Sequence, residues 1–301
     1  MKKIILTAML LLIITACTNT EQNQQKTTTE TSSEISHSFQ KGVTMTYGAD
    51  FNAFFNKALQ AGTVITWAGD WNELSIQDSA PHVLATLAES KKYTPIIEAQ
   101  FFTQSSGKLL RELNDETKQQ YKDSAVAFVE TYNPEYVAFG IEINLLYETS
   151  PEDFAEFVQL YNEVYSAIKE TSPNTNVFTI FQLEYMKKNN EWDLLNEFNT
   201  DLAVFTTYPF ILYNSPADIP ENYYQEIAAH TTKPIAFTEI GWQDANTEFI
   251  TLCFEQMKLL NPEFAVWSFL YDQNVQEPFN TMGLLDSNGN PKQAWNVWIN
   301  A

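Results

Sequence analysis

The stretch that decides the fold is YVAFGIE at residues 136–142, followed closely by PEDFAEFVQLYNEVYSAIKET at Pro151–Thr171. The first run is short and almost entirely apolar, which predicts a buried strand. The second run carries apolar residues at helical spacing. Its first three residues are Pro151, Glu152 and Asp153, and proline and acids suit the first turn of a helix. Together the two runs predict one strand–helix unit.

The same alternation recurs on both sides of this unit, from about residue 40 to the end of the chain. The predicted strands are Val43–Tyr47, Thr63–Trp67, Thr94–Ala99, Tyr136–Glu142, Asn176–Phe181, Leu202–Thr207, Pro234–Glu239 and Ala265–Leu270. The predicted helices that follow them are Phe51–Ala61, Pro81–Ser90, Asp115–Tyr132, Pro151–Thr171, Trp192–Phe198, Asn222–His230, Thr247–Leu260 and Lys292–Ile299. Strands that alternate with helices predict a parallel sheet, and eight such units close into a barrel.

A doubly wound open sheet is the competing architecture for this alternation. It would usually carry a glycine-rich phosphate loop after an early strand. The sequence has no such loop, and it contains only 9 glycines among 301 residues. We therefore expect an α/β fold, a single (β/α)8 TIM barrel over residues 39–301, with no second domain.

The N-terminus has the pattern of an export signal. Residues 1–17 read MKKIILTAMLLLIITAC, with two lysines before the apolar run Ile4–Ile14. That run is too short to cross a bilayer as a permanent helix, so it predicts a signal peptide. Its end, ITAC, resembles a bacterial lipobox, which implies that Cys17 is lipidated. The alternative is an ordinary signal peptide with a chance cysteine.

Residues 18–38 read TNTEQNQQKTTTETSSEISHS and have almost no apolar content. Such a segment cannot bury enough surface to fold, so we expect a disordered tether. The two segments together predict a cell-envelope protein. Its lipid anchor at Cys17 would lie on the outside of the cytoplasmic membrane or in the outer membrane.

The composition of the chain argues against some kinds of ligand and partner. The formal net charge is −21, which argues against nucleic acid as a partner. The three histidines, His37, His82 and His230, lack the spacing of metal ligands, and Cys253 lies in an apolar-periodic stretch typical of a buried cysteine. We expect neither a metal nor another cofactor. Aromatic residues make up 14% of the chain, which suits sugar stacking as well as core packing.

Barrel active sites lie at the carboxyl ends of the strands. The polar and aromatic residues predicted there to bind substrate are Trp67, Asp70, Trp71, Glu98, Gln100, Asn144, Gln182, Tyr208, Trp242 and Trp267. The tryptophans suit the core equally well. Glu184, just beyond the fifth strand, could contact substrate or start a helix.

Two glutamates stand out at these strand ends. Glu142 ends the fourth predicted strand and Glu239 ends the seventh, so they should face each other across the barrel mouth. Hydrolysis of a glycosidic bond needs such a pair, one to protonate the departing oxygen and one to attack or to activate water. The pair therefore predicts glycoside hydrolysis.

The fourth and the last three strands also resemble glycoside hydrolase clan A, and are nearest in character to the family 53 endo-1,4-galactanases. The resemblance rests on GIEIN (Gly140–Asn144), TTYPF (Thr206–Phe210), KPIAFTEIGW (Lys233–Trp242) and MGLLDSNGNPKQAW (Met282–Trp295). It implies a retaining enzyme with Glu142 as acid/base and Glu239 as nucleophile. It also implies that Tyr208 hydrogen-bonds the nucleophile and that Trp267 floors the sugar subsite.

The chain departs from the clan pattern at two points. Ile141 stands where an asparagine usually precedes the acid/base, and Arg111, the sole arginine, does not match the clan's arginine near the nucleophile. Two functions therefore stay open. The first is a retaining glycoside hydrolase that acts on extracellular glycan. The second is a non-catalytic surface lipoprotein that binds carbohydrate on a degenerate hydrolase barrel.

Overall fold

The computed structural model describes residues 39–46 and 50–301. The predicted signal peptide, Cys17 and the predicted tether lie outside the described residues. Among the helices of the described part, none is long and apolar enough to cross a membrane.

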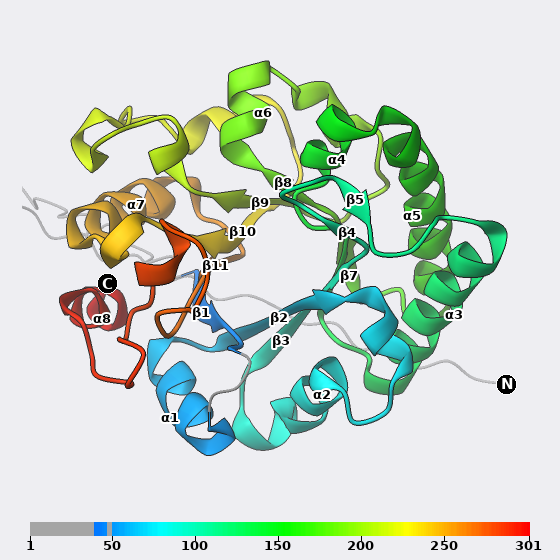
Figure 1. The fold of residues 1–301 in the computed structure, drawn as a ribbon, viewed down its shortest axis with the longest axis horizontal. Coiled ribbons are helices and arrows are strands. Elements are labelled where there is room, and N and C mark those ends of the chain that lie inside the picture. The colour runs from blue at the N-terminus through cyan, green and yellow to red at the C-terminus, as the bar shows by residue number, and fades with distance from the viewer. Residues whose placement is uncertain (1–38, 47–49) are drawn as a thin grey trace, which may run out of the picture. The chain divides into compact units, whose positions relative to one another are not determined.

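Nine parallel strands form one sheet at the centre of the fold (Figure 1). In sheet order they are β7 (Asn176–Phe178), β6 (Tyr136–Phe139), β3 (Thr94–Gln100), β2 (Val64–Asp70), β1 (Gln40–Thr44), β11 (Phe264–Trp267), β10 (Ile235–Ile240), β9 (Ala203–Thr207) and β8 (Ile180–Gln182). The two edge strands, β7 and β8, are separated in the chain by Thr179 alone. The sheet therefore closes on itself as an eight-stranded barrel, as the sequence predicts.

Helices surround this barrel (Figure 1). The α-helices are α1 (Phe51–Ala61), α2 (Ala80–Lys91), α3 (Asp115–Tyr132), α4 (Ile143–Thr149), α5 (Pro151–Thr171), α6 (Leu183–Asn189), α7 (Thr247–Leu260) and α8 (Gln293–Asn300). Of these, α1, α3, α5 and α7 begin and end where the sequence predicts. Local signals fix three of these starts, because Asp50, Asn114 and Asn246 each accept a hydrogen bond from a backbone N–H of the first turn.

Short elements fill the connections. The 3-10 helices are η1 (Trp71–Ser75), η2 (Trp192–Asn196), η3 (Pro209–Ile211), η4 (Pro216–Asp218), η5 (Gln225–Ala229), η6 (Gln243–Ala245) and η7 (Phe279–Thr281). The strands β4 (Phe102–Thr103) and β5 (Lys108–Leu109) pair as a small antiparallel ribbon after β3.

The structure corrects two of the predicted helices. Trp192–Phe198 holds only the 3-10 helix η2, and the α-helix of that unit is α6, which begins directly after β8. Asn222–His230 holds only the 3-10 helix η5. The segment from β9 to β10 contains Pro209, Pro216 and Pro220, and each proline removes a backbone donor and clashes with a preceding turn. These prolines all precede Asn222, and Pro234 follows His230 closely, so the stretch left for a helix is short and forms only the 3-10 helix η5.

Side chains of the strands alternate between two apolar layers, as the pleat requires. One layer fills the barrel interior and includes Val64, Ile96, Ala138, Phe178, Val204, Ala236 and Val266. The other lies between barrel and helices and includes Ile65, Trp67, Ile97, Val137, Phe205, Phe237 and Trp267. Whether a strand residue points to the barrel axis or to the helices therefore depends on its odd or even position along the strand.

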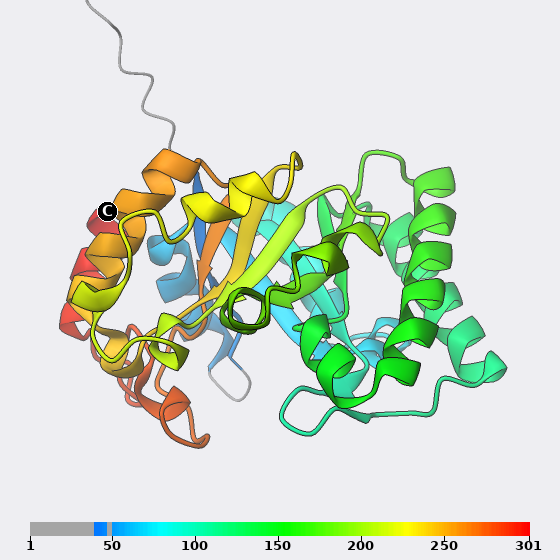
Figure 2. The ribbon, with the colours of Figure 1, turned by 90° about the horizontal axis from the view of Figure 1, so that it is seen from above.

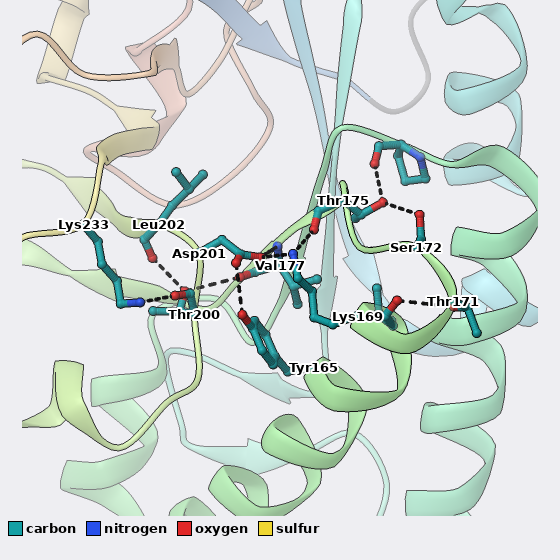
Figure 3. A network of polar contacts seen from close by, with 12 residues as sticks. Tyr165, Lys169, Thr171, Ser172, Thr175, Val177, Thr200, Asp201, Leu202 and Lys233 are labelled. Carbon is teal, nitrogen blue, oxygen red and sulfur yellow. Dashed lines mark hydrogen bonds and ion pairs between the residues drawn. The ribbon is translucent and has the colours of Figure 1, made fainter.

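At the amino-terminal end of the barrel, Asp201 is the centre of a polar network (Figure 3). It precedes β9 and accepts hydrogen bonds from Lys169 Nζ at 2.9 Å, Tyr165 Oη at 3.0 Å and the Val177 backbone N–H at 2.8 Å. Lys233 Nζ and the Thr200 hydroxyl bind neighbouring backbone carbonyls. The network ties α5 to β7 and β9.

Candidate active site

A cleft of about 840 Å³ opens at the carboxyl ends of the strands. The loops that follow β3, in teal, and β11, in orange and red, lie at the same lower end of the barrel in Figure 2 and form opposite walls. The described residues that line the cleft are Thr103, Gln104, Ser105, Glu142, Leu145, Glu148, Thr149, Gln182, Tyr185, Tyr208, Phe210, Ile211, Glu239, Phe269, Val275, Gln276 and Phe279. Its volume suits a small-molecule ligand.

A β-bulge aims Glu239 into this cleft. Along β10, Phe237 packs in the outer layer, so strict alternation would also place Glu239 outside. Instead, Phe237 pairs with Phe205 and Glu239 pairs with the next residue of β9, Thr206. The extra residue, Thr238, shifts the register by one and turns the Glu239 side chain inward.

Glu142 reaches the same cleft through a different backbone device. It follows β6 and adopts a left-handed conformation with φ 57° and ψ 45°, which is costly for a residue with a long side chain. Gly140, two residues earlier, has φ +83°, and a Cβ there would lie 2.8 Å from Phe157 Cζ. Gln100 Nε2 binds the Ile141 carbonyl at 2.9 Å. These contacts hold the strained turn in place.

The two carboxyl groups are held by hydroxyl groups. Thr206 Oγ1 donates to Glu142 Oε1 at 2.7 Å, and Tyr208 Oη donates to Glu239 Oε2. The Ser268 hydroxyl lies 2.9 Å from Tyr208 Oη and fixes the ring. Because the backbone of Thr206 also pairs with Glu239, one strand, β9, connects the two carboxyl groups.

Their environments push the two carboxyl groups toward different charge states. Burial and then the charge of Glu239 raise the pKa of Glu142 to about 8. Burial raises the pKa of Glu239 as well, but the hydrogen bond from Tyr208 opposes that rise by favouring the charged form. We therefore assign the proton at neutral pH to Glu142 and the negative charge to Glu239. Such a difference between neighbouring carboxyl groups marks a division into acid and base.

Glu184 supports this arrangement from behind. Its buried carboxylate accepts hydrogen bonds from the Tyr208 backbone N–H at 2.9 Å, Tyr223 Oη at 2.7 Å, Thr207 Oγ1 at 2.8 Å and Gln182 Nε2 at 2.6 Å. Burial raises its pKa, and these donors oppose the rise. Since it holds the backbone of Tyr208, Glu184 positions the hydroxyl that binds Glu239.

Glu98 lies deeper, on the strand face that points into the barrel. Its side chain is fully buried, and neither carboxyl oxygen has a hydrogen-bond partner among the described residues. Burial and then the charge of Glu239 raise the pKa of Glu98 well above its usual range. A neutral carboxylic acid is the form that this position stabilises.

Of the residues predicted to bind substrate, Gln182 and Tyr208 lie in the cleft wall. Asn144 does not, because its side-chain amide clamps the backbone of Gln182 with contacts of 2.8 and 3.0 Å. Gln100 holds the backbone of Ile141, and Asp70 binds Arg111 through two contacts of 2.7 Å. These residues shape the site from outside its wall.

The four predicted tryptophans are all buried, and none of them lines the cleft. Trp71 stacks on Tyr121, and Trp242 packs on Phe249. Trp67 and Trp267 belong to the layer between barrel and helices. Trp267, expected to floor the sugar subsite, donates its indole N–H to the Met282 carbonyl at 2.8 Å.

Other rings take the place of the tryptophans in the cleft. They are Tyr185, Phe210, Phe269 and Phe279, which the sequence analysis did not single out. Each follows the end of an observed strand, and Phe269 does so only because β11 ends at Trp267, before the predicted strand end at Leu270. Position after β8, β9 and β11 was the one signal that could have identified them.

Within residues 39–46 and 50–301, no group of three or more His, Cys, Asp or Glu side chains is placed to hold a metal ion.

No family model matches the chain, and no curated protein matches its sequence. Solved structures do match its fold. A family 39 glycoside hydrolase from Bacteroides cellulosilyticus WH2 has a TM-score of 0.62 and 15% identity over 86% of this chain and 62% of its own length. A psychrophilic family 10 endo-β-1,4-xylanase has a TM-score of 0.60 and 13% identity over 87% of this chain and 96% of its own.

The protein shares the barrel fold of glycoside hydrolases. A β-glucuronidase of Bifidobacterium dentium, solved with coumarin-3-O-glucuronide, also matches, with a TM-score of 0.59 and 13% identity over 87% of this chain and 46% of its own. This chain thus spans less than two thirds of the family 39 enzyme and about half of the glucuronidase. At these identities the likeness concerns the fold alone.

Proposed function

We propose that this protein is a retaining glycoside hydrolase that acts on extracellular glycan, with Glu142 as acid/base and Glu239 as nucleophile. The observation that carries the proposal is the pair itself. Two carboxyl groups line one cleft at the active end of a barrel, and their surroundings favour a protonated Glu142 beside an ionised Glu239. Glycosidases need that division.

The proposed reaction has two steps. The protonated Glu142 gives its proton to the glycosidic oxygen while a carboxylate oxygen of Glu239 attacks the anomeric carbon, so the C–O bond to the leaving sugar breaks and a glycosyl ester forms. Glu142, now ionised, takes a proton from water, and that water attacks the anomeric carbon and frees Glu239. Tyr208 stabilises the charge on Glu239 before attack and after release.

The rings of the cleft suit a sugar ligand. Tyr185, Phe210, Phe269 and Phe279 supply apolar faces on which a pyranose can stack, while Gln182 and the Thr103–Ser105 loop supply polar groups for hydroxyls. These residues take the roles that the sequence analysis gave to the tryptophans.

We further propose that Cys17 carries a lipid anchor and that residues 18–38 tether the barrel to the cell envelope. Globomycin, which blocks the lipoprotein signal peptidase, should then leave an unprocessed precursor. Processing that is unaffected by globomycin and by Cys17→Ser would remove the anchor from the proposal.

The hydrolase proposal is tested with a panel of aryl glycosides and of plant, microbial and host glycans, galactan among them because of the predicted likeness to family 53. Wild type is compared with Glu239→Gln, which keeps the size of the side chain. We expect turnover by wild type on at least one substrate and its collapse in the variant. Absence of turnover, with equal glycan binding by both proteins, would instead identify a carbohydrate-binding protein on a hydrolase scaffold.

A further inference from the structure

The charged groups of the cleft wall are all acidic. Among the described lining residues these are Glu148 and Glu239, beside the protonated Glu142, and these lining residues include no lysine, arginine or histidine. Tyr47, Gly48 and Ala49, which lie outside the described residues, carry no charged side chain. Two further carboxyl groups, Glu98 and Glu184, lie buried behind the wall.

Nearby cations are engaged by other groups. Arg111 is bound by Asp70, Lys187 by Glu226 and the Tyr223 carbonyl, and Lys292 by Asp272. Lys188 lies 5.6 Å from the ring centroid of Tyr185 but is not part of the wall. An anion in the cleft thus has no cation in the wall to pair with.

The unpaired carboxyl of Glu98 is a second, independent sign of this imbalance. A buried carboxyl group usually finds a cation or a hydrogen-bond donor. Thr66, on the adjacent strand β2, likewise has a buried hydroxyl with no hydrogen-bond partner among the described residues, and no described ion pair involves Glu98. Glu98 thus shows that the described interior behind the cleft supplies no cation to a buried carboxyl group.

From this charge distribution we infer that the cleft accepts glycosides that are neutral or carry a protonated amine, and that it rejects sugars with a carboxylate or sulfate group. The inference rests on the proposed function and narrows its substrate class. It separates this protein from the glucuronidase of similar fold, whose structure holds a glucuronide.

The magnitude follows from Coulomb attraction and repulsion at short range. Two like charges about 6 Å apart at an effective dielectric constant of 20 repel by an energy that corresponds to about a hundredfold in rate or affinity. Solvent in an open cleft weakens this, so we expect kcat/KM for a uronide to be roughly ten- to a hundredfold below that of its neutral parent. Added salt should reduce the difference in kcat/KM between the uronide and its neutral parent.

The experiment uses the full-length protein and aryl glycosides in matched sets that differ at one carbon. One set is glucoside, glucuronide and glucosaminide, and another is galactoside, galacturonide and galactosaminide. In whichever set is hydrolysed, the neutral or amino sugar should react faster than the uronide. A uronide hydrolysed as fast as its neutral parent overturns the inference but leaves the hydrolase proposal intact.

Two variants test whether the cleft charge is the cause. Glu148→Gln removes an exposed carboxylate from the wall, and Glu170→Gln removes one from the outer surface of α5. We expect Glu148→Gln to improve the uronide relative to the neutral sugar by about two- to fivefold and Glu170→Gln to leave the ratio unchanged. Equal effects of the two variants would overturn the inference.

A measurement without sugar separates failure of the inference from failure of the proposed function. Paramagnetic nitroxides that carry an ammonium or a carboxylate group are added in turn, and relaxation of the methyl groups of Leu145, Ile211 and Val275 in the cleft is recorded. The cationic probe should broaden these signals more than the anionic one. Equal broadening overturns the inference even if no glycoside is hydrolysed, whereas unequal broadening without any hydrolysis counts against the hydrolase proposal alone.

Discussion

The two ends of the barrel differ in how their buried carboxyl groups are paired. At the amino-terminal end, Asp201 has a lysine, a tyrosine and a backbone N–H as partners (Figure 3). At the carboxyl end, Glu142 and Glu239 are half-buried in one cleft, each with a hydroxyl donor, and neither forms an ion pair among the described residues. The first arrangement stabilises the fold, whereas the second raises carboxyl pKa values and makes chemistry possible.

The two ends of the barrel also differ in the regularity of their backbone. The carboxyl end of the barrel contains the bulge at Thr238 and the left-handed Glu142, both of which depart from regular strand structure. The Asp201 network instead binds regular elements, α5 to β7 and β9, at their ends. Strain is therefore concentrated where the functional side chains are aimed. Substitutions at the two ends should have opposite effects on activity and stability.

The largest effect should come from Glu142→Gln. We expect kcat/KM on a substrate with a poor leaving group to fall about 10²- to 10⁴-fold, since the proton donor is lost. At neutral pH the free energy of unfolding should rise, by roughly 1–3 kcal/mol, because the variant no longer buries an ionisable group. Steady-state kinetics and urea unfolding measure both quantities. A lower free energy of unfolding for Glu142→Gln than for wild type would contradict the contrast between the two ends of the barrel.

The sign of that stability change follows from proton linkage. The folded pKa of Glu142, about 8, lies above its unfolded value, so its favourable contribution is complete below the unfolded pKa. The contribution is lost as pH rises through about 8. The gain in Glu142→Gln should thus be small at pH 4 and largest above pH 8.

The opposite result is expected for Asp201→Ala. Loss of a carboxylate that accepts from Lys169, Tyr165 and Val177 should lower the free energy of unfolding by about 2–3 kcal/mol. Values of kcat/KM should stay within about twofold of wild type, because the network lies at the other end of the barrel. The exposed Asp123→Ala is the control and should change stability by less than about 0.5 kcal/mol.

A smaller and more specific change is expected for Tyr208→Phe. The hydrogen bond from Tyr208 lowers the pKa of Glu239, so its removal should raise that pKa and move the acidic limb of the kcat/KM profile to higher pH by about one unit. The basic limb should stay near pH 8. An unchanged acidic limb would show that Tyr208 has no electrostatic effect on Glu239.

The smallest effect should come from Thr206→Val. Its hydroxyl lowers the pKa of Glu142, so the basic limb should move upward, by about half a pH unit, while the acidic limb stays in place. Opposite limbs that respond to Thr206 and Tyr208 would identify Glu142 as the group that must be protonated and Glu239 as the nucleophile that must be ionised. A shift of the acidic limb in Thr206→Val would reverse that assignment.

Much of the fold could be predicted because its signals are local. The starts of α1, α3 and α7 are set by capping residues, and that of α5 by Pro151. Between β9 and β10 the helical pattern Asn222–His230 was short, and the structure forms only the 3-10 helix η5 within it. The apolar spacing in this segment did not indicate whether a full α-helix could form.

The site was only partly predictable. In strands that are apolar on both faces, the sequence does not indicate which side chains face the barrel interior and which face the helices. Trp67 and Trp267 end strands, as the active-site rule requires, but point to the helices rather than to the barrel mouth. Glu239 reaches the cleft through a bulge that no sequence pattern indicated. The cleft rings lie in the short helices and loops after β8, β9 and β11, which are too short for periodicity to predict which side chains face the cleft.

The most direct test of the central claim is covalent labelling of the nucleophile. The protein would be treated with the 2-deoxy-2-fluoro aryl glycoside of whichever sugar it hydrolyses, which forms the glycosyl-enzyme readily but releases it slowly. Peptide mass spectrometry then locates the added sugar. Our account predicts a single label on Glu239, absent in Glu239→Gln. A label on Glu142, or full turnover with inversion at the anomeric carbon and no label, would contradict it.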